Sequence, residues 1–419
     1  LDEFDTTPNT TCSLREAIQS ANTDNDFGGC TGVGTYGDDT IVFTPTVTLV
    51  QLTITTTGTD NDDNSFLDLD IVDTNSLSPD DLTIDGGPIS VTIQPSTSVT
   101  WTDRIFDIVP NPTGQPATVT LRNLIIQGGD PTLSNETASG DPCFNSGGGV
   151  RNFSGGALTL ENVTIQNNVM PLNGGGVCQS GSGPLTVLTS TIQNNVANGG
   201  SGGGIFYDAA GFLFIDNSTV LSNTALRSGG GIHDSANVSM TIQNSFVLSN
   251  TVNAPLGGAG GGVWTNDGIF SKQILTSTVA FNRADGDGGG IFNQATRGLQ
   301  VFDSTVLSNT AGAFQNNPGN GGGIWSERPL TIGNSQVLSN TAFYTGTSVT
   351  PPPGGGGIYH RASPFFAPPL TIDNSRVAHN LARALSGPSI AGGGIWNSSI
   401  ATLSAVTVEH NLADGVPGF

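Results

Sequence analysis

A glycine triplet followed by Val or Ile occurs nine times in this chain of 419 residues. Successive triplets are 27 to 37 residues apart. The third glycines of the triplets are Gly149, Gly176, Gly204, Gly231, Gly262, Gly290, Gly323, Gly357 and Gly394. After each triplet comes a segment close to LTIxNSxVxSNTA, whose second Asn recurs as Asn168, Asn195, Asn223, Asn250, Asn282, Asn309, Asn340, Asn380 and Asn411. A repeat of this length predicts a stack of similar units, each too small to bury an apolar face alone.

The repeating unit has the pattern of short β-strands. Leu330 and Ile332 alternate with polar residues, β-branched residues dominate, and Gly and Asn punctuate the pattern. Three strands of about four to six residues with tight turns use about 27 residues, which makes one coil of a parallel β-helix. Helical repeats are longer, and the LxxLxLxxN spacing of leucine-rich repeats is missing. We therefore expect an all-β, single-stranded solenoid.

Stacking assigns a role to each conserved position of the repeat. Equivalent residues of successive coils lie about 4.8 Å apart, so each repeat position becomes a column along the rod. The Val or Ile after each triplet and the apolar residues of LTI are expected to point inward. The Asn column is expected at a turn, where its amides can bond one another. The glycines are expected at a tight corner that leaves no room for a Cβ.

The organisation predicted from the sequence is one continuous solenoid of about 12 coils. Residues 1–35 form an N-terminal cap with a helix at 13–22, residues 36–130 form the first irregular coils, and residues 131–419 form the regular coils. Ser13 and Glu16 have capping-box spacing, and Leu14 and Ile18 lie on one helical face. We expect this helix to cover the first coil, because an open solenoid end exposes unpaired strands.

Composition narrows the classes of partner. The chain has 12 Lys and Arg against 34 Asp and Glu, a formal net charge of −22. Such a polyanion is repelled by phosphate backbones and anionic headgroups, so we expect neither nucleic-acid binding nor direct membrane insertion of this segment. No apolar run approaches the about 18 residues of a membrane span.

Four cysteines, Cys12, Cys30, Cys143 and Cys178, lack the spacing of a metal site. We predict two disulfides, Cys12–Cys30 and Cys143–Cys178, in a secreted or cell-surface protein; four free thiols are the alternative. The chain starts at Leu1 and stops in the middle of a repeat, and no second lid is evident. We expect a longer parent protein, or a partner or another copy at the open end.

The segment CSLREAI at residues 12–18 resembles the signature of a family of exported bacterial proteins, the CSLREA-type proteins. Further segments resembling that family are LDLDI at 67–71, LTIDGG at 82–87, DRIFDI at 103–108 and VTLRNL at 119–124. The triplet repeats resemble those of polymorphic outer-membrane proteins and autotransporter-type adhesins. The resemblance implies a right-handed parallel β-helix at a bacterial surface or in the extracellular space, and it carries over no catalytic residues.

Polysaccharide cleavage is a known activity of parallel β-helices, so its requirements were compared with the sequence. Eliminating lyases use Lys or Arg as base beside a cation, but Lys272 is the only Lys and no Arg recurs at one repeat position. Resemblance to the polygalacturonase family would require NTD, paired Asp, GHG and RIK motifs; GHG and RIK are absent, and the NTD at 22–24 ends the predicted helix. We therefore predict a protein without enzymatic activity and without a required cofactor.

Aromatic residues recur directly after the Val or Ile that follows the triplets. They are Phe206, Trp264, Phe292, Trp325, Tyr359 and Trp396. Strand alternation places them opposite the inward Val and Ile, as an outward stripe that could stack on sugars or pack against a partner. The alternative is that the stripe is covered by the long loops or belongs to the core.

Two further groups are candidates for metal binding. Asp60, Asp62 and Asn64 alternate oxygen ligands as a calcium loop does, with Asp68, Asp70 and Asp73 close in sequence; a solvated acidic loop is the alternative. His379 and His410 occupy one repeat position on adjacent coils and could bind a metal as a pair, although two surface histidines are the simpler interpretation.

These features predict a rod-shaped, non-enzymatic structural or adhesin-like module, outside the cell or on its surface. Its expected partners are other copies of itself, as in a surface layer or filament, or components of the cell envelope. The alternative function is that of a β-helix that binds or degrades carbohydrate, with the aromatic stripe in contact with glycans.

Overall fold

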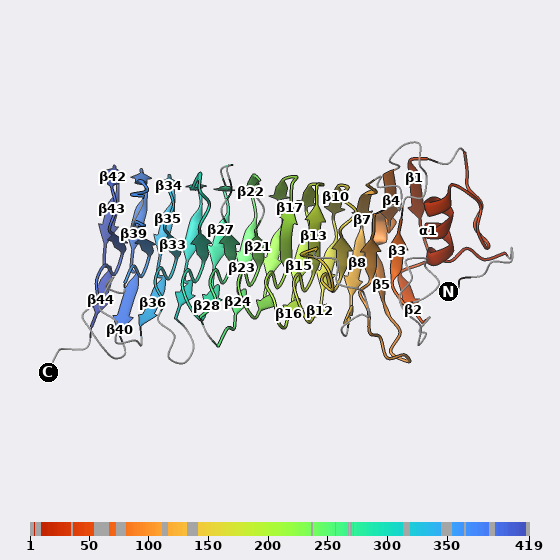
Figure 1. Cartoon of the computed structure of the whole chain (residues 1–419), viewed down its shortest axis with the longest axis horizontal. Coiled ribbons are helices and arrows are strands. Elements are labelled where there is room, and N and C mark those ends of the chain that lie inside the picture. Colours follow the sequence, from red (N-terminus) through yellow and green to blue (C-terminus); the bar gives the residue numbers. More distant parts are fainter. Residues whose placement is uncertain are drawn as a thin grey trace.

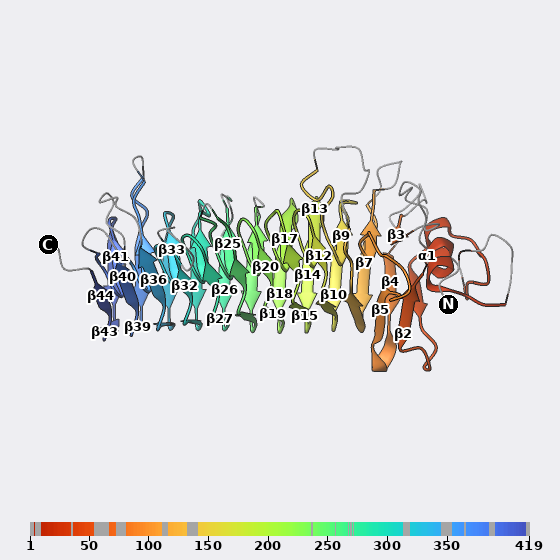
Figure 2. The same ribbon diagram turned by 90° about the horizontal axis from the view of Figure 1, so that it is seen from below.

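The computed structural model describes residues 4, 10–34, 37–53, 67–72, 81–110, 116–131, 141–235, 238–255, 257–266, 268, 270, 272–312, 319–344, 354–363, 366–384 and 390–415. These residues form a long rod whose coils follow one another in sequence order (Figures 1 and 2). Every strand pairs in parallel with its equivalents in the preceding and following coils, giving four sheets. The fold is the predicted right-handed parallel β-helix, with twelve strands in each of its two longest sheets.

Sheets 1 and 2 run almost the whole length of the rod. Sheet 1 contains β1 (Asp39–Val42), β4 (Asp81–Asp85), β7 (Thr118–Arg122), β10 (Leu158–Glu161), β14 (Leu185–Leu188), β18 (Leu213–Asp216), β22 (Met240–Gln243), β26 (Lys272–Leu275), β30 (Leu299–Phe302), β34 (Leu330–Gly333), β38 (Leu370–Asp373) and β42 (Ala401–Ser404). Sheet 2 contains β2 (Leu49–Leu52), β5 (Val91–Pro95), β8 (Leu124–Gln127), β11 (Thr164–Gln166), β15 (Thr191–Gln193), β19 (Thr219–Leu221), β23 (Phe246–Leu248), β27 (Thr278–Ala280), β31 (Thr305–Leu307), β35 (Gln336–Leu338), β39 (Arg376–Ala378) and β43 (Thr407–Glu409).

Sheets 3 and 4 flank the glycine triplets. Sheet 3 contains β12 (Val169–Met170), β16 (Val196–Ala197), β20 (Thr224–Ala225), β24 (Thr251–Val252), β28 (Arg283–Ala284), β32 (Thr310–Ala311), β36 (Thr341–Tyr344), β40 (Leu381–Ala384) and β44 (Leu412–Asp414). Sheet 4 contains β3 (Leu69–Ile71), β6 (Phe106–Ile108), β9 (Val150–Asn152), β13 (Val177–Gly181), β17 (Ile205–Ala209), β21 (Ile232–Asp234), β25 (Val263–Thr265), β29 (Ile291–Asn293), β33 (Ile324–Ser326), β37 (Ile358–His360) and β41 (Ile395–Asn397).

The regular coils therefore have four strands, and the expectation of three strands per coil was wrong. The additional strand is the short one of sheet 3, of two to four residues, between the Asn turn and the glycine triplet. A segment this short shows no alternation in the sequence and is a strand only because its equivalents in adjacent coils bond to it.

The interior is one continuous apolar core built from columns of like residues. Ile242 of β22 lies between Ile215 and Ile274, and Val247 of β23 lies between Val220 and Val279. All are almost completely buried. Burial therefore comes mainly from the next coil above and below.

The nine glycine triplets lie over one another at a single corner, as predicted. The first glycine of each triplet has a positive φ of 60° to 76°. A Cβ on Gly231, at the third position, would lie 2.7 Å from the carbonyl oxygen of Gly262 in the next coil. Glycine is required here because adjacent backbones approach too closely for a side chain.

The Asn column forms a continuous hydrogen-bonded ladder at the turn between sheets 2 and 3. The Oδ1 of Asn250 accepts bonds from the backbone N–H and the Nδ2 of Asn223, at 2.9 and 3.0 Å. The Nδ2 of Asn250 donates to the Val220 carbonyl at 2.9 Å. A second ladder, not predicted, lies at the turn between sheets 1 and 2, where the Ser190 N–H donates to Ser218 Oγ and the Ser218 N–H to Ser245 Oγ, each at 3.0 Å.

The helix α1 (Leu14–Thr23) covers the first coil at the N-terminal end of the rod (Figure 1). Ser13 is its N-cap, and Glu16 completes the predicted capping box. Ile18 is fully buried, and the Asn22 amide donates to the Asp70 carbonyl and accepts from the Val72 N–H. The predicted lid is confirmed. Among the described residues, no helix is long and apolar enough to cross a membrane.

Candidate functional site

The outer face of sheet 4 carries the aromatic residues singled out in the sequence. In each strand the first residue belongs to the core, and the second lies on the opposite face. The second residues pair from coil to coil as one column, namely Arg151, Cys178, Phe206, His233, Trp264, Phe292, Trp325, Tyr359 and Trp396. We call this column the aromatic column; its predicted direction, away from the core, is confirmed.

The rings of the aromatic column stack on one another. Phe206 and His233 have ring centroids 5.0 Å apart, His233 and Trp264 4.1 Å, and Phe292 and Trp325 4.2 Å, with interplanar angles of 4° to 6°. Tyr359 and Trp396 stack at 4.2 Å. Parallel rings at strand spacing cover one another's faces and leave mainly their edges for contact with solvent or a ligand.

The expectation of a solvent-exposed stripe was therefore wrong for most of the column. Phe206, Trp325 and Tyr359 are only 6%, 4% and 2% exposed, whereas Trp264 and Trp396 are half-buried. The stacking itself hides the rings. The glycine corner adds to this burial, because an added Cβ on Gly355 would lie 2.7 Å from the Tyr359 Cβ.

A second outward column runs beside the aromatic column, two residues further along each coil. From the middle of the rod to its C-terminal end it contains Asp208, Ser235, Asn266, Gln294, Glu327, Arg361 and Ser398. We call it the polar column. All seven residues are half-buried or exposed. Sequence inspection missed this column because it is polar but not uniform, and only the coil register shows that it is continuous.

The polar column is internally bonded around Glu327. An Arg361 Nη donates to Glu327 Oε2 at 2.6 Å, and the Gln294 amide donates to Glu327 Oε1 at 3.2 Å. The Arg361 guanidinium also lies over the Trp325 ring, 5.7 Å from its centroid. Amide, carboxylate and guanidinium groups are thereby held on three successive coils, facing outward.

Two carboxyl side chains, the buried Asp285 and the half-buried Asp287, lie at the corner beside the aromatic column. Asp287 Oδ1 accepts hydrogen bonds from the Asn320 backbone N–H at 2.8 Å and from its Nδ2 at 3.0 Å. Burial raises the pKa of Asp287 to about 6, against the lowering effect of the Asn320 bonds and the Arg361 charge. Burial likewise raises the pKa of Asp285 to about 6, opposed by a backbone bond at Ala254 and by Arg283. Such carboxyls exchange protons near neutral pH.

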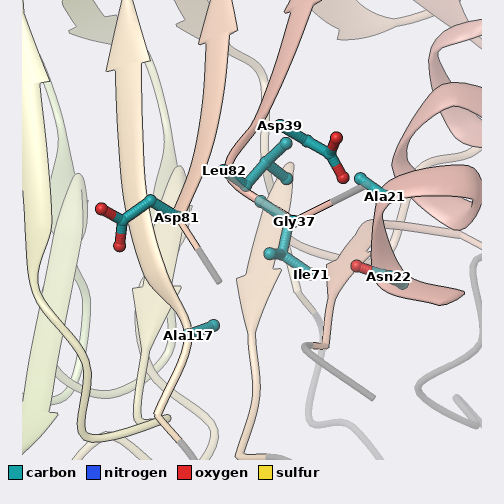
Figure 3. A pocket seen from close by; sticks show the side chains of 8 residues that line it. All are labelled: Ala21, Asn22, Gly37, Asp39, Ile71, Asp81, Leu82 and Ala117. Atoms are coloured by element: carbon teal, nitrogen blue, oxygen red, sulfur yellow. The ribbon is translucent and has the colours of Figure 1, made fainter. Parts of the chain in front are cut away.

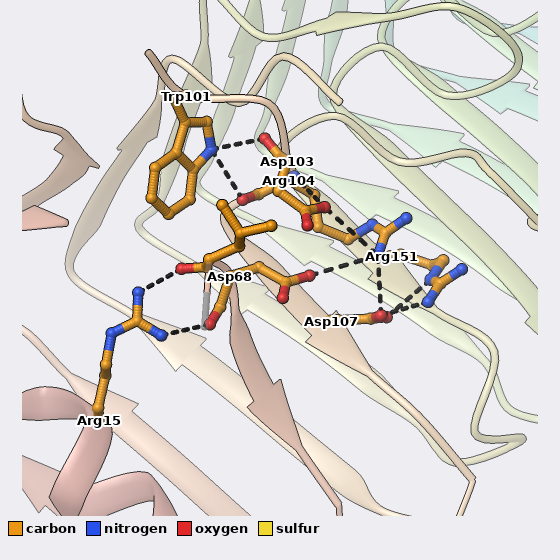
Figure 4. Close-up of polar contacts among 8 residues, drawn as sticks. Arg15, Asp68, Trp101, Asp103, Arg104, Asp107 and Arg151 are labelled. Atoms are coloured by element: carbon orange, nitrogen blue, oxygen red, sulfur yellow. Dashed lines mark hydrogen bonds and ion pairs between the residues drawn. The ribbon is translucent and has the colours of Figure 1, made fainter. Parts of the chain in front are cut away.

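A buried cluster of arginines and aspartates continues the aromatic column toward α1, on the outer face of sheet 4 (Figure 4). Asp107 is contacted by both Arg104 and Arg151, and Arg104 also reaches Asp68 at 3.3 Å. Arg15 donates from α1 to the backbone carbonyls of residues 67 and 68.

Within the part of the chain that the structure describes, Asp68, Asp70 and Asp107 are the only group whose ligand atoms converge as a metal site requires. They are almost fully buried, and guanidinium groups already pair with Asp68 and Asp107. We therefore assign this cluster a structural role, in which it joins the cap helix to the first coils.

A small cavity separates α1 from β1, β3 and β4 (Figure 3). It is lined by residues such as Asn22, Asp39 and Leu82 and has a volume of about 20 Å³. That is enough for one water molecule and too little for an organic ligand.

The two predicted disulfides are confirmed as Cys12–Cys30, beside the cap helix, and Cys143–Cys178, between neighbouring coils. Disulfides of this kind persist in oxidising compartments, which places the protein outside the cytosol.

The candidate metal ligands give mixed results. Asp60, Asp62 and Asn64 lie outside the described residues, as does Asp73, so the calcium site stays a prediction. His379 and His410 are neighbours on adjacent coils, as predicted, with ring centroids 5.0 Å apart. Both are exposed, and metal binding by them also stays a prediction.

A polar column inside the core was missed at the sequence level. From β9 to β41 the third residue of each sheet-4 strand faces the interior, and these residues are Asn152, Gln179, Tyr207, Asp234, Thr265, Asn293, Ser326, His360 and Asn397. The side chains from Asn152 to His360 are fully buried. Several bond to carbonyls of the following turn: Asn152 Nδ2 donates to Gly156, Ser326 Oγ donates to Arg328, and His360 Nε2 bonds Arg328. The signal was available, because this position is polar in every repeat.

Comparison with known proteins adds little beyond the fold. No protein-family model matches the chain, and no curated protein does. Two solved structures are similar: the periplasmic alginate epimerase AlgG and a mutant of it. The first has a TM-score of 0.38 and 13% identity over 80% of this chain and 79% of that chain; the second has a TM-score of 0.37 and 14% identity over the same shares. At these values the likeness carries no inference about substrate or activity, and no family is assigned.

Proposed function

We propose that this protein is an exported, non-catalytic rod that serves as a structural or adhesive module at a cell surface and holds neutral glycans along its polar column. The observation that carries the proposal is this column of half-buried and exposed side chains from Asp208 to Ser398, beside the aromatic column. The other columns described above serve to stack one coil on the next.

The spacing of the polar column suits an extended chain of sugars. Its side chains recur at each coil, about 4.8 Å apart, so a linear polymer lying along the rod would meet one polar group at every coil. Gln294 and Glu327 present planar groups that exchange hydrogen bonds with hydroxyls, and Arg361 adds donors. The half-buried Trp264 and Trp396 offer apolar edges beside them.

Charge restricts the partner. A net charge of −22 repels polyanions such as pectins or alginate, and the one cation among these three polar-column residues, Arg361, is paired with Glu327. We therefore propose neutral glycans of a cell envelope, or other copies of the rod, as partners.

A binding screen tests the proposal. The full chain is presented to immobilised neutral and acidic glycans, beside a triple variant, Gln294→Ala with Glu327→Ala and Arg361→Ala. A matched control, Thr164→Ala with Thr191→Ala and Gln193→Ala, removes side chains of similar exposure from sheet 2. We expect binding to neutral glycans that the first variant weakens at least tenfold and the control leaves unchanged. Absence of glycan binding, or equal loss in both variants, would contradict the glycan-holding role.

A second candidate function is modification of a glycan, and Asp287 is the observation that favours it. Its carboxyl titrates at about pH 6 and lies close enough to Tyr359 and Arg361 for their charges to interact. A group of this kind can act as a general acid or base. Incubating glycans with the wild type and with Asp287→Asn, and assaying for new reducing ends, unsaturated products or changed sugar configuration, separates the two functions. Turnover that Asp287→Asn abolishes would overturn the non-catalytic proposal.

A further inference from the structure

Lys272 is the only lysine in the chain, and it lies inside the rod. It begins β26 in a core column of sheet 1, between Met240 and Leu299 of the adjacent coils. Its side chain is 0% exposed. Lysine is seldom buried completely, because removing its charge from water is costly.

The amine of Lys272 contacts a buried carboxyl. Its Nζ lies 2.5 Å from Asp234 Oδ2, and the Asp234 side chain is also 0% exposed. Asp234 belongs to the interior polar column, with Tyr207 and Thr265 as its neighbours on the adjacent coils. The two partners come from successive coils: Asp234 ends β21, and Lys272 lies in the coil that begins with β25.

A buried amine and a buried carboxyl held in contact can do more than form an ion pair. Condensation to an amide is unfavourable in water because the groups are dilute and water is abundant. Here the nitrogen lies 2.5 Å from a carboxyl oxygen, and both side chains are completely buried. Fixed proximity of this kind corresponds to effective concentrations of about 10⁵ M or more.

We propose that Lys272 and Asp234 join covalently, as an amide bond between the lysine Nζ and the aspartate Cγ. One proton passes from the ammonium to the carboxylate, which makes both groups neutral. The amine lone pair then attacks Cγ, the N–C bond forms, and one carboxyl oxygen leaves as water with the proton it received and a second proton from the nitrogen. The ammonium and carboxylate give one amide and one water, and no other reactant is consumed.

Tyr207 neighbours Asp234 in the interior polar column, and we propose it as a hydrogen-bond donor to the reaction. Burial raises the pKa of its phenol, with a further contribution from the nearby Asp234 charge, so the hydroxyl keeps its proton. In the structure this hydroxyl donates to the Gly183 carbonyl, at 3.5 Å. Turned toward Asp234, it would donate instead to the oxygen that becomes negative during attack.

The bond would be a third covalent link along the rod. Cys12–Cys30 joins segments at the cap, and Cys143–Cys178 links neighbouring coils in the first half of the rod. The amide would link neighbouring coils from inside, further toward the C-terminal end. It would also remove a buried ion pair from the core.

Intact mass spectrometry of the reduced, denatured wild-type chain tests the proposal directly. We expect a mass lower than the sequence mass by one water. We also expect that an amine-reactive reagent in denaturant labels the α-amino group and leaves Lys272 unlabelled. Fragmentation should recover the peptides around residues 234 and 272 as one branched species. A reduced chain of full sequence mass, or a labelled Lys272, overturns the proposal.

Two variants control for water loss elsewhere. Lys272→Met places in the column the residue type of its neighbour Met240, and Asp234→Ala removes the acceptor. Both are expected to have their full sequence mass. A one-water deficit that persists in Lys272→Met would assign the loss to another site and overturn the proposal. Tyr207→Phe should slow the appearance of the mass deficit in chains sampled at intervals after synthesis; an unchanged rate would remove Tyr207 from the reaction.

Discussion

The central coils and the last described coil contain the same repeat but bury it very differently. Ile242 and Val247 are 0% and 1% exposed, whereas Leu403 and Val408, in the same two columns, are 52% and 50% exposed. Strand lengths, alternation and the Asn turn are alike in both places. The difference is the presence of a following coil, so the unit that stabilises this fold is a pair of neighbouring coils rather than a single coil.

Adding one methyl group at the glycine corner should have the largest effect and should depend on a following coil. In Gly231→Ala the Cβ would lie 2.7 Å from the Gly262 carbonyl oxygen, a backbone atom that cannot move aside. In Gly394→Ala the nearest atoms belong to the side chain of Asn411. We expect a loss of about 3–5 kcal/mol of unfolding free energy for Gly231→Ala and about 1 kcal/mol for Gly394→Ala, measured by denaturant unfolding. Equal losses of unfolding free energy in the two variants would show that the added methyl group clashes within its own coil and not with the following coil.

Truncating equivalent core residues should give the next largest difference. Ile242→Ala leaves a cavity between two coils and should cost about 3–4 kcal/mol, whereas Leu403→Ala removes a side chain that is half in water and should cost about 1 kcal/mol. Denaturation midpoints of the two variants check this. A Leu403→Ala loss as large as that of Ile242→Ala would mean that the last coil is covered in solution.

The Asn ladder should show the same contrast on a smaller scale. Asn250→Ala removes the acceptor for two donors of Asn223 in a fully buried site and should cost about 3 kcal/mol. Asn411→Ala removes the same bonds to Asn380, but its site is half-buried, and water can replace them at a cost of about 1 kcal/mol. Hydrogen exchange at the amides of Asn223 and Asn380 would measure each loss locally.

The smallest effect at neutral pH is expected for His233→Phe, which extends the ring stack of Phe206 and Trp264 with an uncharged ring. Burial lowers the pKa of His233 from 6.5 to about 3. Between these values the unfolded chain binds a proton that the folded chain does not, so the histidine destabilises the fold as pH falls below about 6.5.

Relative to His233→Phe, the wild type should therefore lose about 1.4 kcal/mol for each further pH unit below that point. Unfolding midpoints from pH 7 to pH 4 measure the difference between the two proteins. Both proteins contain Asp285 and Asp287, so comparing them removes the contribution of these carboxyls to the pH dependence. Their raised pKa values make the fold more stable as pH falls from about 6 to about 4, which is opposite to the effect of His233. Parallel pH profiles would contradict burial of a neutral His233.

The columns of identical residues were the part of the molecule that could be predicted. Nine glycine triplets that alternate with nine recurring Asn residues permit few arrangements other than stacking on a common axis. The capping box at Ser13 marks the only described helix of more than three residues. Columns whose residue type changes from coil to coil were harder to predict. The polar column mixes Asp, Ser, Asn, Gln, Glu and Arg, and no periodic signal distinguishes it from a solvated turn until the register is known.

By itself the sequence determined the β-helix, the number of its coils, the glycine corner and the Asn turn, because these follow from local backbone preferences that recur along the chain. The capping box and the even number of cysteines predicted the cap and the two disulfides. Tertiary structure alone decided which side chains meet across coils. It stacked the aromatic rings face to face, so that an outward stripe became mostly buried, and it brought Lys272 onto Asp234 across 38 residues. Which side chains meet across coils depends on how many residues each intervening turn contains. A local sequence pattern does not reveal the combined length of those turns.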